Sequence, residues 1–371
     1  MANLFIVYTP FQLMIAQEII HQEKLENNIM IKGYVGNNTQ FLQIYDYLQV
    51  DGMWNKEYII PSISSSLDVD LHHPFQSMIR IRKNYKKLEK LIAQNKVDTL
   101  FLGNINNNSL RIMAKVYAEK KLKIAFFEEG AAHYTYQQIC LLSHKLNIAK
   151  IYKWGFNLIC YKPLFNQAIG EWQFERALQF EEIPISSRYN ILQHYNEPFD
   201  KKLICTGAIG EKAKELVKKE ISTIKSKNKI LFLDQPVYEI VKGSVECYIE
   251  TISSFLDTIS KDTDIIIKYH PREIQSIKEK IERVVQSKGY KYTIIGNTIN
   301  LPVELYLQLI PFKAVYNFYT SSSLYNGKLF PETIFHYLIE NLYAKCQRDE
   351  LSQSDQLLEL VNLCRKIANK H

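Results

Sequence analysis

Short apolar runs alternate with longer amphipathic segments in the first part of the chain. Residues 3–9, "NLFIVYT", form a β-branched and aromatic run typical of a buried strand, and residues 10–23, "PFQLMIAQEIIHQE", place apolar side chains at helical spacing. Similar runs predict strands near 30–36, 56–61, 99–104 and 123–130, and helices over 77–95 and 109–121. Strands that alternate with helices predict a parallel, doubly wound sheet.

A second series of the same kind begins after residue 200. It predicts strands at 229–236, 264–271, 291–297 and 314–325, the last with a turn, and helices near 211–228 and over 245–260, 273–289 and 302–310. Two domains of ordinary size suit a chain of 371 residues. We therefore expect two Rossmann-like domains, residues 1–200 and 201–371, although no linker-like segment marks the boundary.

The composition is that of an ordinary soluble globular enzyme, with 46% hydrophobic and 23% charged residues. The chain holds neither GxxxxGK[ST] nor GxGxxG, so a nucleotide would be bound without these glycine-rich loops. Six scattered cysteines without a CxxC pattern indicate reduced thiols of a cytoplasmic protein. The first twenty residues lack a basic segment, and Pro10 and Gln12 interrupt their apolar run, which argues against a signal peptide or a membrane span.

Positive charge gathers in one segment. The formal net charge is +7, which would suit a polyanion or a membrane surface but also follows from a composition rich in lysine and asparagine. Residues 80–90, "RIRKNYKKLEK", predict one exposed basic helix face. Its candidate acceptor-binding residues are Arg80, Arg82, Lys83, Lys86 and Lys87; the alternative is a face that is merely solvated.

Polar residues follow several of the predicted strands, at the edge where parallel sheets bind ligands. Glu128 and Glu129 follow "KIAFF", and repulsion between them would raise the pKa of one member, as suits a general base. His270 follows "DIIIKY", and Pro271 biases it to an extended conformation. This histidine could protonate a leaving group. The alternatives are two solvated loop acids and a capping or core histidine.

Hydroxyl groups follow another predicted strand. Such groups bind phosphate oxygens at a helix start, or simply cap the helix. Glu304, in the first turn of a predicted helix, could accept hydrogen bonds from ribose hydroxyls or complement the helix dipole. The candidate donor-binding residues of the second domain are Thr320, Ser321, Ser322, Ser323 and Glu304, with Gln235 and Pro271 from the "DQP" and "HP" at strand ends.

Two DxD sequences are candidate metal sites that we set aside. Residues 262–264, "DTD", precede a predicted strand and so lie at the wrong edge of the sheet for a ligand. Residues 68–74, "DVDLHHP", lie in an apparent loop without a cluster of further ligands. We expect neither a metal nor a cofactor.

The motifs together resemble those of bacterial sialyltransferases of the GT-B type, most closely the capsule polysialyltransferases (glycosyltransferase family 38) and next the lipooligosaccharide sialyltransferases. An acidic pair before glycine, a His-Pro after a strand and a Ser/Thr cluster occur in that family order as "FFEEG", "IIIKYHPRE" and "YTSSSLY". The opening "NLFIVYTPFQLMIAQ" and the glutamate of "LPVELY" are further matches. Some capsule enzymes carry a segment before the first strand, whereas this chain begins almost at it, being either naturally short or shortened.

The resemblance implies an inverting, metal-independent transfer of sialic acid from CMP-sialic acid in a cleft between two facing domains, the first binding acceptor and the second donor. Glu129 would be the general base, with Glu128 beside it. His270 would protonate or stabilise the departing CMP phosphate, and Glu304 would hold the ribose. Ser321 and Ser322 would bind phosphate, with Thr320 and Ser323 as alternatives in register.

The acceptor implied is an anionic oligo- or polysialic acid, elongated as capsular polysaccharide. A cytoplasmic enzyme is expected, with peripheral association with the inner membrane or a capsule assembly complex left open, and without a nucleic acid partner. The alternatives are a lipooligosaccharide enzyme that adds a single sialic acid, or a GT-B protein that is not a transferase, such as a sugar epimerase or a glycan binder.

Overall fold

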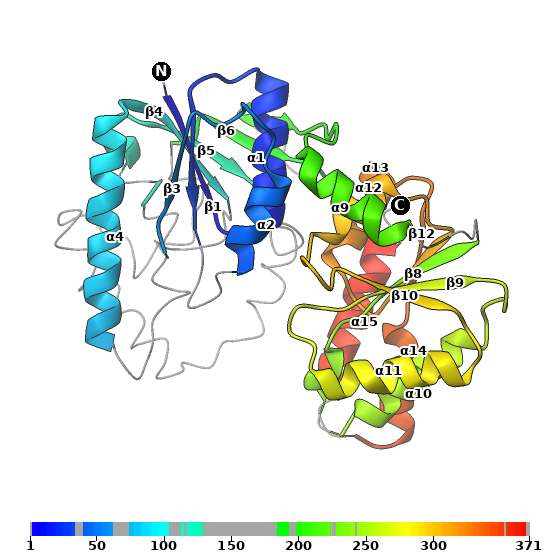
Figure 1. Cartoon of the computed structure of the whole chain (residues 1–371). Helices are drawn as coiled ribbons and strands as arrows, with labels where there is room; N and C mark the ends of the chain where they lie inside the picture. Colours follow the sequence, from blue (N-terminus) through cyan, green and yellow to red (C-terminus); the bar gives the residue numbers. More distant parts are fainter. Residues whose placement is uncertain are drawn as a thin grey trace. The chain divides into compact units, whose positions relative to one another are not determined.

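The computed structural model describes residues 2–33, 40–61, 74–103, 113–114, 117–128, 184–192, 198–222, 224, 228–241, 243–351 and 354–368. The chain divides into two compact units, Met1–Ala213 and Lys214–His371 (Figure 1). The sequence predicted the boundary between residues 200 and 201. The first unit extends further because strand β7 (Asp200–Lys202) pairs with its sheet, and because the N–H of Gly210 donates to the carbonyl of Leu48.

The first unit contains a parallel sheet in the order β3-β2-β1-β4-β5-β6-β7. This is the doubly wound Rossmann order, in which the chain reverses direction between β1 and β4. All described strand pairs are parallel. The remaining strands are β1 (Ala2–Val7), β2 (Asn28–Lys32), β3 (Lys56–Ile59), β4 (Val97–Gly103), β5 (Lys123–Phe127) and β6 (Ser187–Asn190).

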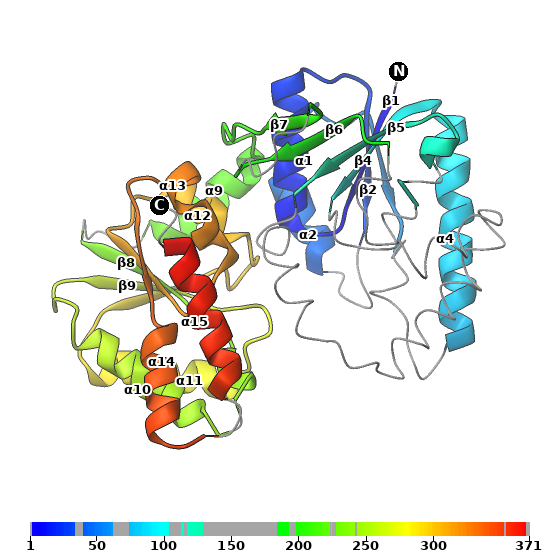
Figure 2. The same ribbon diagram turned by 180° about the vertical axis from the view of Figure 1, so that it is seen from behind.

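Helices cover both faces of this sheet. Helix α4 (Pro74–Gln94) lies on one face, and α1 (Pro10–Glu23) and α2 (Gln40–Leu48) lie on the other (Figures 1 and 2). Buried side chains of α4 pack with alternate residues of β1, β4 and β5, whereas Phe5 and Phe101 stack on the opposite face at 4.1 Å between ring centroids. Of the predicted helix over 109–121, the structure describes residues 113–114 and 117–121, and residues 113–114 and 117–119 are helical.

The second unit contains a parallel sheet in the order β10-β9-β8-β11-β12. The chain moves from β8 outward to β10 and then returns to β11 on the other side of β8, as in half of a Rossmann fold. The strands are β8 (Lys229–Leu233), β9 (Asp264–Lys268), β10 (Tyr292–Ile295), β11 (Ala314–Asn317) and β12 (Ile334–Tyr337).

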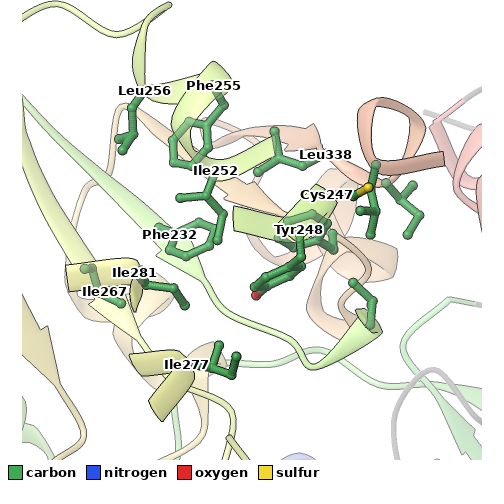
Figure 3. Packing of buried hydrophobic residues seen from close by; sticks show 14 of the residues in the cluster. Phe232, Cys247, Tyr248, Ile252, Phe255, Leu256, Ile267, Ile277, Ile281 and Leu338 are labelled. Atoms are coloured by element: carbon green, nitrogen blue, oxygen red, sulfur yellow. The ribbon is translucent and has the colours of Figure 1, made fainter. Parts of the chain in front are cut away.

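Helices of the second unit also lie on both faces of its sheet (Figure 2). One face carries α10 (Val245–Leu256), α11 (Gln275–Ser287), α14 (Ile339–Arg348) and α15 (Ser354–Ala368). The other face carries α12 (Val303–Leu309). Helix α9 (Glu211–Ile221) begins at the end of the first unit, and its Glu220 accepts the hydroxyl of Tyr306 on α12. The short elements are η2 (Val237–Glu239), η3 (Ser321–Tyr325) and α13 (Asn326–Leu329). Phe232, Tyr248 and Phe255 are among the aromatic residues of the buried cluster (Figure 3).

The predicted fold class is confirmed. Both units are parallel, doubly wound α/β structures, the make-up of the GT-B class. Helix α1 has the predicted bounds, with Thr9 as its N-cap and Pro10 in its first turn. The sequence patterns did not predict β6 and β7, whose residues are mostly polar. A buried ion pair joins them: Arg188 binds both carboxylate oxygens of Asp200, at 2.5 and 2.8 Å.

Candidate functional site

The polar candidates of the second unit gather at one edge of its sheet. Gln235 follows β8, His270 follows β9, and the hydroxyl run at residues 320–323 follows β11. Strand order reverses between β8 and β11, and ligands of open parallel sheets bind at the carboxyl ends of strands at such a point. The side chain of Gln235 joins the segments that follow β8 and β11, because its Oε1 accepts the backbone N–H of Tyr319 at 2.5 Å.

His270 is held in one orientation by its own turn. Its Nδ1 accepts the backbone N–H of Arg272 at 3.1 Å, which assigns the neutral tautomer with hydrogen on Nε2. Burial lowers the pKa of the imidazole below its usual value, and the charge of Arg272 lowers it further. The ring is therefore neutral at pH 7 and offers Nε2–H as a donor.

A buried carboxyl group lies against this turn. Asp234, directly after β8, accepts the hydroxyl of Tyr248 at 2.5 Å and the backbone N–H of His270 at 3.4 Å. Burial raises its pKa to about 8, with Glu273 as the next cause. The sequence interpretation singled out "DQP" but selected only Gln235 from it. A charged residue directly after an apolar strand was the available signal.

Three members of the hydroxyl run, Thr320, Ser322 and Ser323, are buried and bonded within the protein. Ser322 Oγ donates to Glu304 Oε1 at 2.7 Å, and Ser323 Oγ donates to the carbonyl of Thr320 at 2.6 Å. Ser322 is 1% exposed, and the Thr320 side chain is also buried. In this arrangement Ser322 orients a carboxylate, and the side chain of Ser321 lies outside the described part of the structure.

A buried lysine that the sequence interpretation missed lies beside Glu304. Lys268, the last residue of β9, donates to Asn300 Oδ1, and its Nζ lies 5.5 Å from the centre of the Tyr306 ring. Burial lowers its pKa to about 8, and the charges of Glu220 and Glu304 oppose that shift. Burial also raises the pKa of Glu304, while the hydroxyl of Ser322 and the charge of Lys268 lower it. Lys268 is thus the cation that favours an ionised Glu304.

The acidic pair of the first unit is described only in part. Glu128 follows β5 and is fully buried, and its Oε2 accepts the backbone N–H of Ile191 at 2.8 Å. Its own N–H donates to the carbonyl of Tyr189. Glu128 therefore joins the end of β5 to the end of β6, and Glu129 lies outside the described residues.

The predicted basic helix forms, and its charges face outward. Arg80, Lys83, Lys86 and Lys87 are exposed on α4, and Arg82 is half-buried. Lys87 Nζ donates to the carbonyl of Ile59 at 2.9 Å. An anionic ligand can reach this face.

The described residues hold no group of three or more His, Cys, Asp or Glu side chains placed to bind a metal ion. Asp264 begins β9 and Asp262 precedes it, so both lie at the amino end of that strand, as the sequence predicted. The other DxD, at 68–70, lies outside the described residues. Within the described part of the chain, none of the helices is both long enough and apolar enough to cross a membrane.

Two Rossmann-like units, each with a parallel sheet, are the make-up of the GT-B fold class. Residues 3–339 match the family model described as Alpha-2,8-polysialyltransferase (POLYST). The chain belongs to this family, and it is therefore a glycosyltransferase and a sialyltransferase. The family implies a sialic acid donor and an oligosialyl acceptor.

A search among curated proteins finds no match to the sequence. Several solved structures are distantly similar. A UDP-GlcNAc 2-epimerase from Methanocaldococcus jannaschii with UDP-GlcNAc and UDP is 14% identical over 94% of this chain and 92% of that chain, with TM-score 0.45. The ADP-heptose LPS heptosyltransferase II of E. coli is 11% identical over 94% and 100%, with TM-score 0.40. A UGT transferase from Siraitia grosvenorii with UDP is 11% identical over 93% and 84%, with TM-score 0.45. With TM-scores below 0.5, these likenesses assign nothing to this chain.

Proposed function

We propose that this chain is an inverting, metal-independent sialyltransferase that moves sialic acid from CMP-sialic acid to the end of an oligosialic acid chain and so elongates capsular polysialic acid. The observation that carries the proposal is the state of His270. With Nδ1 occupied by the N–H of Arg272, the neutral ring keeps Nε2–H for a phosphate oxygen at the carboxyl end of β9. A departing CMP phosphate needs such a donor, because negative charge develops on its oxygen.

The nucleotide is bound by the carboxyl edge of the second sheet in this proposal. Glu304 accepts hydrogen bonds from the ribose hydroxyls, and Ser322 and Lys268 support it by orienting the carboxylate and favouring its ionised form. Ser321, Thr320 and Ser323 remain candidates for the phosphate. For Ser322 to bind phosphate, its hydroxyl would have to leave Glu304, so we assign it to the carboxylate.

The chemical step is a single displacement. An acceptor hydroxyl oxygen forms the new bond to the anomeric carbon of sialic acid, while the bond from that carbon to the phosphate oxygen breaks and its electron pair leaves with CMP. Glu129 takes the proton of the acceptor hydroxyl, and His270 stabilises the charge on CMP through Nε2–H. One displacement inverts the anomeric configuration. Charge stabilisation by His270 and hydrogen-bonding groups makes a metal unnecessary.

The acceptor in this proposal is a polyanion that contacts α4. Its exposed residues Arg80, Lys83, Lys86 and Lys87 present positive charge along one helix face, and such a face attracts a chain of carboxylates. Single transfer to a galactose-ended glycolipid needs no such surface. We place the enzyme in the cytoplasm, where CMP-sialic acid and a growing capsule polymer would meet it, with peripheral membrane association as an open addition.

The test is incubation with CMP-sialic acid and either an oligosialic primer or a lactoside. We expect a ladder of products from the primer, CMP release that depends on the primer, unchanged activity in excess EDTA, and an inverted anomeric centre by NMR. A single addition to the lactoside would indicate the lipooligosaccharide activity instead. Loss of activity on chelation, with recovery on adding Mg²⁺ or Mn²⁺, would contradict the metal-independent mechanism.

A further inference from the structure

Two carboxyl groups face each other beneath the His270 turn. Asp234, after β8, is 3% exposed, and Glu273, three residues after His270, is 6% exposed. Their side chains lie within hydrogen-bonding reach of each other. Neither carboxyl forms a salt bridge within the described part of the chain, so like charges here would be uncompensated, a costly arrangement in a buried site.

The surrounding donors account for all the carboxyl oxygens except one. Asp234 accepts from the hydroxyl of Tyr248 and the N–H of His270. Glu273 Oε1 accepts from the hydroxyl of Tyr238 at 2.6 Å and the N–H of Ile274 at 2.9 Å. Glu273 Oε2 is buried and has no hydrogen-bond partner among the described residues. A proton on Asp234 would supply the missing donor, and the raised pKa of Asp234 agrees with that proton being held at neutral pH.

Both members of the pair also hold the backbone of His270. The N–H of His270 donates to Asp234, and the N–H of Glu273 donates to the carbonyl of His270 at 2.9 Å. Tyr248 anchors Asp234 from the apolar core, where its ring lies among the buried side chains of α10 and the sheet (Figure 3). The turn that carries the imidazole is thus held by the carboxyl of Asp234 on one side and by the backbone N–H of Glu273 on the other.

We propose that Asp234 and Glu273 share one proton, and that this pair is the positioning device that holds the His270 turn in its working geometry until loss of the proton releases it. The inference rests on the proposed role of His270 in transfer. Ionisation of both carboxyls would place two negative charges in contact, break the hydrogen bond between them and loosen the turn. The pair would therefore limit activity on the alkaline side of neutrality.

Other ionisable groups around the pair do not replace the shared proton. Tyr248 of α10, Tyr238 of η2 and Tyr269 of the β9 end contribute phenol groups whose pKa values are raised above their usual value, so they stay neutral near pH 8. Arg272 is exposed and pairs with Glu239 at 3.8 Å rather than with either carboxyl. Lys268 and His270 complete the neighbourhood, and Lys268 acts on the imidazole as a like charge.

Asp234→Asn tests the pair because it imitates the protonated acid at every pH. Its amide can donate to Glu273, and its carbonyl can accept from Tyr248. The Lys268 ammonium also titrates near pH 8, so transfer is measured at saturating CMP-sialic acid, where weaker donor binding does not limit the rate. Under this condition we expect wild-type transfer to fall as pH rises through about 8, and Asp234→Asn to keep its pH 7 rate within about threefold and to lose that fall. Asp264→Asn, the same change at the opposite end of β9, should keep the wild-type profile. Identical alkaline profiles for Asp234→Asn and wild type would overturn the proposal.

A second readout does not depend on activity. In protein labelled with ¹³C-histidine, the imidazole signal of His270, assigned by comparison with His270→Gln, should shift with a midpoint near pH 8 in wild type and not in Asp234→Asn. If Asp234→Asn does not fold, Glu273→Gln provides the same substitution from the other side. An NMR transition without any transfer activity would refute the proposed function but leave the carboxyl pair standing, whereas activity without the transition would refute the pair.

Discussion

The backbone N–H of Arg272 donates to Nδ1 of His270 across 3.1 Å. The turn itself therefore decides which ring nitrogen carries hydrogen, without a second side chain such as a carboxylate on Nδ1. Burial and the charge of Arg272 also lower the pKa of the ring. His270 is accordingly suited to stabilising charge on a phosphate oxygen as a neutral donor, and binding of an anionic phosphate would move its pKa back upward.

Removal of the imidazole should affect the reaction more than nucleotide binding. We expect His270→Ala to lower the transfer rate by roughly 10²-fold or more, because leaving-group assistance of this kind contributes about 10²–10⁴-fold. CMP affinity, measured by calorimetry, should stay within about tenfold of wild type. His336→Ala is the matched control, because His336 lies on β12 of the same sheet and stacks on Tyr316. Near wild-type turnover in His270→Ala would exclude His270 from the reaction.

Sequence patterns were sufficient for the elements with strong apolar periodicity. They predicted α1 with its bounds, and they placed His270 and Glu304 at a strand end and in the first turn of a helix. They did not predict β6 and β7, because an ion pair and backbone pairing rather than apolar alternation join these strands. Tertiary contacts that leave no local pattern decide such segments.

The sequence predicted those residues of the candidate site that directly follow an apolar strand. No pattern in the sequence indicates that the hydroxyl of Ser322 turns to Glu304, or that Asp234 meets Glu273, because these residues are 18 and 39 positions apart and meet only in the folded unit. Lys268 is the last residue of the apolar strand β9, and Asp234 directly follows the apolar strand β8. A charged residue at the carboxyl end of an apolar run was the sequence signal available for both.

Lys268 should support donor binding through Glu304. We expect Lys268→Met to raise the KM for CMP-sialic acid by about tenfold with a smaller effect on kcat, because without the ammonium the buried Glu304 takes up a proton more readily and accepts ribose hydroxyls less well. Lys268→Arg should restore part of the affinity. An unchanged KM in Lys268→Met would separate Lys268 from donor binding.

The low pKa of Lys268 also predicts that the difference in unfolding free energy between wild type and Lys268→Met depends on pH. Folded Lys268 loses its proton near pH 8, whereas a lysine in the unfolded chain keeps it until about pH 10.5. The unfolded state therefore binds more protons across this range, and wild type should gain stability relative to Lys268→Met as pH rises from about 8 to 10. Urea unfolding of both proteins at several pH values measures the difference, and a constant difference would mean that the ammonium is not desolvated.

The basic face of α4 should matter for long acceptors. Charge reversal by Lys83→Glu with Lys86→Glu should raise the apparent KM for long oligosialic acceptors more than for short ones, and the effect should shrink as salt rises, because exposed charges are screened over about 8–10 Å at physiological ionic strength. Lys218→Glu with Lys219→Glu, an exposed pair on α9, is the control. Equal effects on long and short acceptors would identify the α4 face as merely solvated.

We expect the two glutamates of "EEG", Glu128 and Glu129, to have different roles, one in stability and one in catalysis. Glu128 is buried and accepts the N–H of Ile191 at 2.8 Å, so Glu128→Ala should leave that buried donor without its acceptor and lower the free energy of unfolding by roughly 1–3 kcal/mol. Glu128→Gln retains an oxygen acceptor and should cost less. Glu129→Gln keeps the size of the side chain but cannot take a proton, so we expect transfer to fall by roughly 10²-fold or more while CMP affinity and Tm hold.

Measurements of kcat, CMP affinity and urea unfolding on Glu128→Ala, Glu128→Gln and Glu129→Gln separate these roles. The expected pattern is a loss of stability confined to Glu128→Ala and a loss of turnover confined to Glu129→Gln. If Glu128→Gln lost turnover while Glu129→Gln kept it, the base would be the buried carboxylate, and its bond to the N–H of Ile191 would have to open during the reaction. If both glutamine variants remained fully active, neither carboxylate could be the base, and the proton of the acceptor hydroxyl would have to go elsewhere.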